Sequence, residues 1–186
     1  MVWSDEKKFN LDGPDGFNGY WHDLRKEPQH FSKRNFGGGS VMIWGAFESR
    51  GTLPLAFVSK KMNSQEYQEM LETQLIPYWQ PEYLFQQDNA SIHGSASTME
   101  FLLNNGVQVM EWPACSPDLN PIENLWGILV RNVYCDNKQY ETVEELKSAV
   151  LRAWSNVDGD CLGRLVESVP RRLIEVIKAR GGQTHY

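Results

Sequence analysis

The sequence predicts a mixed α/β fold, in which a sheet of three antiparallel strands followed by a βαβ crossover is flanked by helices. Two observations predict it. Three strand-like runs come first, and helical and strand-like segments then alternate until residue 120, beyond which the pattern is helical throughout. A chain of 186 residues, 41% of them apolar, is long enough to bury one full-sized core, so we expect one domain over residues 1–186. Several mixed α/β folds share this order of elements.

The first strand is predicted over residues 2–9. A stretch rich in glycine, proline and aspartate follows over residues 10–39, and its composition is typical of turns. A connection of this length inside a domain is usually functional. Residues 41–47 and 53–59 then form a predicted hairpin around Gly51.

The middle of the chain alternates helix and strand. Residues 62–79 have helical spacing of apolar side chains, and Asn63 with a glutamate three residues later predicts a capped start. A strand is predicted over residues 83–87, a helix over 95–105 and another strand over 107–110.

Four helices are predicted in the last third. They cover residues 121–134, 142–154, 161–168 and 171–180, and the last begins just after Pro170. The second opens with Thr-Val-Glu-Glu, the pattern of a capping box.

Charge and cysteine content limit the function classes. The formal net charge is −6, and the three cysteines include no CxxC pair, which argues against a disulfide framework and against structural zinc. A reducing compartment is the natural expectation. No apolar run approaches the ~18 residues that span a bilayer, so we expect a soluble protein without membrane contact.

Three acidic residues stand where predicted elements begin or end. Asp5 lies on the first strand, Asp88 ends the strand 83–87, and Glu123 opens a helix. If the two strands are neighbours, both aspartates project from one end of the sheet and Glu123 closes the site. Each residue also has a plain structural explanation: a solvent-facing strand residue, a turn, and the N3 position of a capping box that begins at Asn120.

Three carboxylates at one point repel one another, and divalent cations relieve that repulsion. Two ions about 3.5–4 Å apart would hold the attacking and leaving oxygens of an in-line phosphoryl displacement. Oxygen ligands favour Mg²⁺, for which Mn²⁺ can substitute, over zinc. Asp5, Asp88 and Glu123 are thus candidate metal ligands and catalytic residues, and at this point their structural explanations stay open.

The motifs around these residues are specific. They are SDEK at residues 4–7, QDNASIH at 87–93 and WPACSPDLNPIENLW at 112–126, and 123 − 88 − 1 = 34 residues separate the last two acidic positions. Together they resemble the catalytic domain of Tc/mariner-type DDE transposases, and the spacing and the final glutamate resemble the Tc branch. NLDGPDG at 10–16 and NFGGG at 35–39 also resemble that branch, so the likeness covers nearly the whole chain.

The resemblance implies a ribonuclease-H-like fold and a metal-binding triad of Asp5, Asp88 and Glu123, with Asp88 bridging two Mg²⁺ ions. It implies cut-and-paste transposition: cleavage of double-stranded DNA at transposon ends with water as nucleophile, then joining of the 3′-hydroxyl to a TA target. It also implies a clamp loop over residues 12–38 that contacts the partner subunit of a homodimer. We expect such a protein to work in the nucleus.

The sequence departs from the family pattern in two ways. Ser91 stands where many members have proline, and the helix-turn-helix reader that precedes the first strand in the family is absent. We therefore expect this chain alone to bind DNA weakly. His93 belongs to the second motif, and both a local hydrogen-bonding role and a contact with DNA or the reaction centre stay open.

Two other functions remain open. One is a transposon-derived protein that kept the fold as an inactive interaction or dimerisation module, and the other is a nuclease for RNA–DNA hybrids. Four tryptophans in apolar patterns are predicted to be core rather than base-stacking residues: Trp44, Trp112, Trp126 and Trp154. Basic residues at 171, 172, 178 and 180 suit a solvated helix face better than a phosphate path.

Overall fold

The computed structural model describes residues 1–14 and 39–181. Most of the predicted clamp loop lies outside the described residues. So do two basic pairs that the sequence places in it, Arg25 with Lys26 and Lys33 with Arg34.

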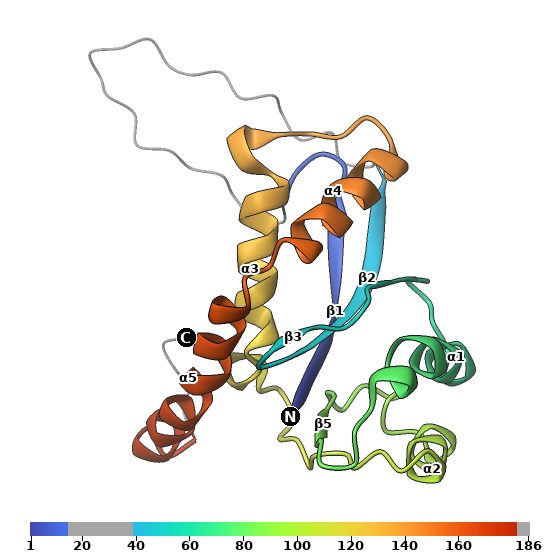
Figure 1. Ribbon diagram of the computed structural model, residues 1–186, viewed down its shortest axis with the longest axis vertical. Coiled ribbons are helices and arrows are strands. Elements are labelled where there is room, and N and C mark those ends of the chain that lie inside the picture. The colour runs from blue at the N-terminus through green and yellow to red at the C-terminus, as the bar shows by residue number, and fades with distance from the viewer. Residues whose placement is uncertain (15–38, 182–186) are drawn as a thin grey trace.

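The sheet is mixed, as predicted. Its strands are β1 (Val2–Asn10), β2 (Ser40–Glu48), β3 (Gly51–Thr52), β4 (Ala56–Val58) and β5 (Phe85–Gln86). The order is β3-β2-β1-β5, with β4 also paired to β2, and the pairs of β2 are all antiparallel. The short β5 joins β1 in parallel beside the N-terminus (Figure 1).

Two predicted strands are shorter than expected. Of the predicted run over residues 53–59 only β4 is strand, because Pro54 lies close to the start of the run and has no N–H to donate to a ladder; β3 lies just before the run. The predicted strand over residues 107–110 is reduced to one bridge between Val109 and Phe85. It is held by two backbone hydrogen bonds of 2.8 Å on either side of Phe85.

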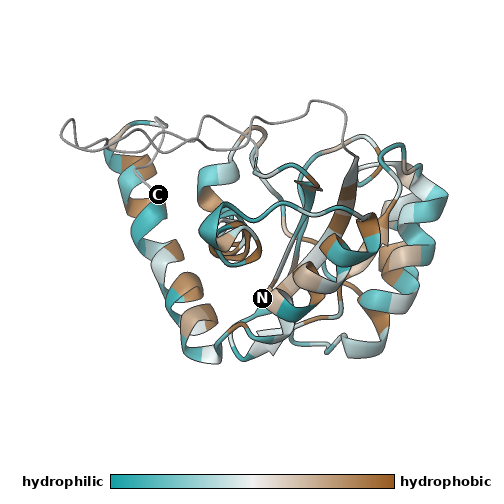
Figure 2. Cartoon of the chain, turned by 90° about the horizontal axis from the view of Figure 1, so that it is seen from above, coloured by the Kyte–Doolittle hydropathy of each residue, from teal (hydrophilic) through white to brown (hydrophobic). Residues whose placement is uncertain are grey.

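Two helices cover one face of the sheet (Figure 2). The first, α1 (Ser64–Gln74), begins with the predicted reciprocal capping box between Asn63 and Glu66. It is shorter than the predicted helix because a 3₁₀ turn (Ile76–Tyr78) containing Pro77 follows it. The second, α2 (Ala96–Asn104), is capped by Ser95.

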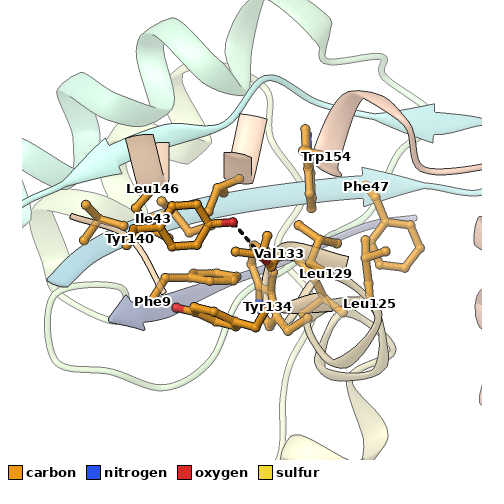
Figure 3. Close-up of a cluster of buried hydrophobic side chains, with 14 of the residues drawn as sticks. Phe9, Ile43, Phe47, Leu125, Leu129, Val133, Tyr134, Tyr140, Leu146 and Trp154 are labelled. Carbon is orange, nitrogen blue, oxygen red and sulfur yellow. Dashed lines mark hydrogen bonds between the residues drawn. The ribbon is translucent and has the colours of Figure 1, made fainter. Parts of the chain in front are cut away.

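Three helices cover the opposite face: α3 (Ile122–Val133), α4 (Val143–Ser155) and α5 (Gly159–Lys178). Their apolar side chains pack on β1 and β2 in the larger core (Figure 3). Short 3₁₀ turns precede and follow α3 (Pro117–Leu119 and Cys135–Asn137). The predicted box at α4 is half formed, since Thr142 accepts from the Glu145 N–H but the Glu145 carboxylate accepts from the Glu141 N–H.

The prediction of two final helices is wrong, because α5 runs without interruption through Pro170. A proline inside a helix removes one backbone hydrogen bond but leaves the rest of the ladder possible. Both halves of α5 have a buried side chain, Leu162 before Pro170 and Arg172 after it, so both halves pack against the rest of the fold. None of the helices in residues 1–14 and 39–181 combines the length and apolarity that crossing a bilayer requires.

Alternation along β1 divides its side chains between the two faces. Trp3 and Phe9 pack in the core under α3 and α4, while Val2 packs in the core under α1 and α2. Asp5 therefore faces α3, and Glu6, the next residue, faces the helices on the other side.

Candidate active site

The pairing of β1 with β5 brings the two aspartates to the same end of the sheet. Val2 is opposite Phe85 in a parallel register, and three residues farther along lie Asp5, which is still on β1, and Asp88, which is two residues past the end of β5. The two strands are thus neighbours, which is the condition under which the sequence predicted a shared site. The third acidic residue, Glu123, lies in the first turn of α3.

All three acidic residues line one cavity of about 360 Å³. The remaining lining comes from the segment after Asp88 and from the loop that leads into α3, namely Asn89, Ala90, Trp112, Pro113, Ala114, Cys115, Pro117 and Asn120. The structure thus brings the three predicted residues together on the wall of a single cavity.

Asn120 joins the segments that carry these carboxylates. Its buried amide donates to the Ser4 carbonyl at 3.1 Å, next to Asp5 in the chain, and its Oδ1 accepts from the N–H of Ile122 at 3.3 Å. The Ser4 hydroxyl in turn donates to the Gln86 carbonyl at 2.7 Å. Buried hydrogen bonds therefore fix the backbone beside each of the three acidic residues.

The alternative of Glu123 as a capping-box residue is wrong. The helix begins after Pro121 with no side-chain cap, and the Asn120 N–H that such a box would satisfy donates to the Pro117 carbonyl at 3.0 Å. The Glu123 carboxylate instead lies on the cavity wall, with Oε2 3.8 Å from Lys7 Nζ. Both side chains are more than a third exposed, so this ion pair contributes little to stability.

The surroundings of Asp5 disfavour the ionised form of its carboxyl group. Burial, the charge of Glu123 and the charge of Glu6 raise its pKa to about 7. One contact lowers the pKa of Asp5: the indole Nε1–H of Trp126 donates to Asp5 Oδ2 at 3.0 Å. Trp126 follows Glu123 by three positions, so one side of α3 presents both residues to the site.

Asp88 has the opposite electrostatic environment. Its Oδ1 lies 2.6 Å from Nδ1 of His93 and accepts from the Ala90 N–H at 2.9 Å. The hydrogen bond with His93, more than the opposing burial, keeps its pKa below the usual range. Burial would lower the pKa of His93, but hydrogen bonds and charges of Asp88 and Glu6 raise it to about 9. His93 thus has a local hydrogen-bonding role.

The donor set fits a divalent cation in ligand type. Carboxylate oxygens are the ligands that Mg²⁺ and Mn²⁺ prefer, and the pKa of Asp5 is raised first by burial and then by the neighbouring charges of Glu123 and Glu6. Each of the three carboxylates is held by a protein partner, respectively Trp126, His93 and Lys7. Within residues 1–14 and 39–181, no three His, Cys, Asp or Glu side chains gather closely enough to enclose an ion as they stand.

The tryptophan predictions hold for three of four residues. Trp44, Trp126 and Trp154 are buried, whereas Trp112 is half-buried and lines the cavity. It packs edge-on against Trp3, with ring centroids 6.0 Å apart, and its carbonyl accepts from the Asn89 side chain at 2.8 Å. No sequence signal distinguishes this position, since the Trp-Pro pair there fits a core residue equally well.

Arg172 is buried, so the prediction that it lies on a solvated helix face is wrong, and it is not part of a phosphate path either. Its guanidinium donates to Ser168 Oγ at 2.9 Å, to the Asp118 carbonyl at 2.8 Å and to Asn124 Oδ1 at 2.7 Å. These contacts join α5 to the loop before α3 and to the residue after Glu123. Arg172 therefore stabilises the position of α3 and of the loop before it, both of which contribute residues to the cavity wall.

Residues 1–147 of the chain match the family described as DDE superfamily endonuclease. The chain belongs to this family. It is 54% identical over 190 residues to the Tc3 transposase of Caenorhabditis elegans, covering all of this chain and 58% of that protein. It is 34% identical over 192 residues to the Tc1 transposase of the same organism, covering 70% of it. The Tc-type recognition is confirmed, and the chain spans little more than half of its Tc3 relative.

The fold matches solved structures of the Mos1 transposase. A Mos1 paired-end complex with the left transposon end superposes with a TM-score of 0.83 at 22% identity, over 98% of this chain and 55% of that one. The Mos1 catalytic domain alone gives a TM-score of 0.71 at 16% identity, over 99% of this chain and 83% of that one. The ribonuclease-H-like fold is thereby confirmed, and the chain is homologous to the catalytic domain of Tc1/mariner cut-and-paste transposases.

Proposed function

We propose that this chain carries out metal-dependent phosphoryl transfer on DNA, cleaving strands at transposon ends and joining the freed 3′-hydroxyl to a TA target. The observation that carries the proposal is the meeting of Asp5, Asp88 and Glu123 on one cavity wall in a DDE endonuclease chain. Mos1 relatives with this fold were solved with Mn and with Mg. The proposed substrate is chromosomal DNA, so the proposed place of action is the nucleus, and the proposed assembly of the full-length protein is a homodimer.

The three carboxylates would hold two Mg²⁺ ions, which when bound activate the attacking oxygen and stabilise the leaving one. The other residues of the site keep these ligands in place. Trp126 orients Asp5, His93 orients Asp88, and Asn120 fixes the start of the helix that carries Glu123. Lys7 lies beside Glu123 and can contact a phosphate at the cavity edge once Glu123 binds a cation.

A nicking assay tests this function. Supercoiled plasmid is incubated with the purified chain in Mn²⁺ or Mg²⁺, and Glu123→Gln is compared with Glu100→Gln, which removes an exposed carboxylate on α2. We expect Glu123→Gln to lower nicking at least about a hundredfold while the fold is kept, since it removes a metal ligand at nearly constant shape. Equal nicking by Glu123→Gln and the parent chain would overturn the assignment.

A second candidate is an inactive interaction module. It is favoured by the engagement of each carboxylate with a protein partner and by the lack of a gathered ion site in the described part of the chain. Crystals soaked in Mn²⁺ and examined by anomalous diffraction discriminate the two. Peaks bounded by Asp5, Asp88 and Glu123 support the enzyme, and their absence at millimolar Mn²⁺ supports the module.

A further inference from the structure

Glu6 and Asp5 are consecutive on β1 and point to opposite faces of the sheet. Asp5 meets Trp126 on the α3 side. Glu6 meets His93 on the other side, where its Oε1 lies 3.3 Å from His93 Nε2. Since His93 Nδ1 contacts Asp88, the imidazole connects Glu6 to a predicted metal ligand on the neighbouring strand.

The contact between Glu6 and His93 is buried. The His93 side chain is 4% exposed and that of Glu6 is 20% exposed. Oε1 and Nε2 are both shielded from water and make no well-aligned hydrogen bond among the described residues, so their ion pair is what compensates their desolvation. Removal of the Glu6 carboxylate would leave Nε2 buried without that partner.

The imidazole is fixed from other directions as well. The ring of Tyr67 lies against it, with centroids 4.3 Å apart and an interplanar angle of 34°. The His93 carbonyl accepts from Gln87 Nε2 at 3.2 Å, and Gln87 Oε1 accepts from the Tyr67 hydroxyl at 2.9 Å. Backbone and ring are therefore both restrained, and the contact of Nε2 with Glu6 restrains the ring from one more side.

We propose that Glu6 and His93 form a positioning pair that sets the orientation of the Asp88 carboxylate for cation binding. The contacts of His93 and of the Ala90 N–H both go to Oδ1 of Asp88, whose side chain belongs to a residue that lines the cavity. Outer-shell partners of this kind fix the orientation of a ligand and typically change metal affinity 10–100-fold when they are removed. The inference rests on the proposed function, because it takes Asp88 as a metal ligand.

The test is Mn²⁺ affinity of the purified chain, measured without DNA by titration with electron paramagnetic resonance detection. Glu6→Ala removes the carboxylate behind His93, and Glu72→Ala removes an exposed carboxylate of α1 as the matched control. We expect Glu6→Ala to weaken Mn²⁺ binding about tenfold or more and Glu72→Ala to change it less than about twofold. Glu6→Gln keeps an oxygen acceptor for Nε2 and should stay within about threefold of the parent chain.

A double-mutant cycle separates positioning from general loosening. In the His93→Asn background the connection is already broken, so Glu6→Ala should cause no further loss of Mn²⁺ affinity. Additive losses of Mn²⁺ affinity in the double mutant would overturn the positioning pair. So would an unchanged Mn²⁺ affinity of Glu6→Ala, provided that this variant unfolds at the same temperature as the parent chain in EDTA. If Glu6→Ala does not fold, the same cycle with Glu6→Gln, which keeps the side-chain size, decides in the same way.

Asp88→Asn distinguishes failure of this inference from failure of the proposed function. Mn²⁺ affinity that survives Asp88→Asn overturns Asp88 as a ligand, and with it both proposals. A loss in Asp88→Asn with none in Glu6→Ala overturns the positioning pair alone.

Discussion

Trp126 and Asp5 are linked by a 3.0 Å hydrogen bond from the indole Nε1–H to Oδ2, across the interface between α3 and β1. The indole is fully buried and stacks on Trp154 with ring centroids 5.5 Å apart. A core side chain thus positions a carboxylate of the cavity, so a change in the packing of this core also displaces that carboxylate.

Gly45 makes this arrangement possible, and its replacement is our first prediction. Gly45 lies opposite Asp5 in the β1–β2 register, and a Cβ there would come within 2.7 Å of Trp126 and 3.0 Å of Trp154. Gly45→Ala should therefore destabilise the chain by about 1–3 kcal/mol and displace the indole from Asp5. Urea unfolding measures the loss, and the matched Gly51→Ala, whose Cβ would meet nothing within 4 Å, should be nearly neutral. Equal effects of the two changes would contradict this account.

The raised pKa of Asp5 predicts a pH-dependent stability. Unfolded, the group ionises near 3.8, and folded, near 7. Between these values the unfolded chain binds fewer protons than the folded chain, so this group lowers stability as pH rises and the loss is complete above pH 7. In EDTA, Asp5→Asn should be more stable than the parent chain by about 1–3 kcal/mol at pH 8.

Thermal unfolding across pH checks this expectation. The gap between the melting temperatures of Asp5→Asn and the parent chain should widen from pH 5 to pH 7 and stay constant above. Millimolar Mn²⁺ should narrow the gap at pH 8, because a bound cation stabilises only the chain that keeps the carboxylate. A gap that is independent of pH would show that Asp5 is not ionising in this range.

Arg172 yields a third prediction. Its guanidinium satisfies three acceptors on α5, α3 and the loop before α3, and a lysine ammonium cannot reach all three in the same plane. Arg172→Lys should cost about 2–4 kcal/mol of unfolding free energy, since it leaves buried acceptors unpaired. Arg171→Lys, on the exposed side of the same helix, should change stability by less than about 0.5 kcal/mol in the same urea titration. A neutral Arg172→Lys would rule out this stabilising role.

Local patterns predicted most of the elements, whereas the three acidic residues were chosen through the resemblance of the motifs around them. Apolar periodicity located the main strands and helices, and the capping motif before α1 has the predicted reciprocal bonds. Pattern reasoning failed at the two prolines. Pro54 shortens a strand that alternation predicts over residues 53–59, and Pro170 lies inside a helix because packing on both sides outweighs one lost hydrogen bond.

The supporting residues of the site could not be predicted in the same way. The prediction that Trp126 is a core residue is correct, but its hydrogen bond to Asp5 depends on how α3 lies against β1. Alternation assigns Glu6 to the face opposite Asp5, yet nothing in the sequence pairs it with His93, 87 positions away. The capping-box pattern at Glu123 was misleading, because the Asn120 that would begin the box is used by Ser4 and Ile122.

Charge leads to the last prediction, which concerns DNA binding by residues 1–186 alone. Affinity for duplex DNA comes largely from neutralised phosphates, whereas this chain has a net charge of −6 and a cavity lined by three carboxylates. Gel shifts at about 150 mM salt should therefore show dissociation constants of about 1 µM or weaker, with little preference among sequences. Millimolar Ca²⁺, which also takes oxygen ligands, should tighten binding of the parent chain but not of Asp88→Asn, because only the parent keeps the carboxylate that we propose as a metal ligand. Tight, sequence-selective binding in EDTA would contradict the expectation that this chain alone binds DNA weakly.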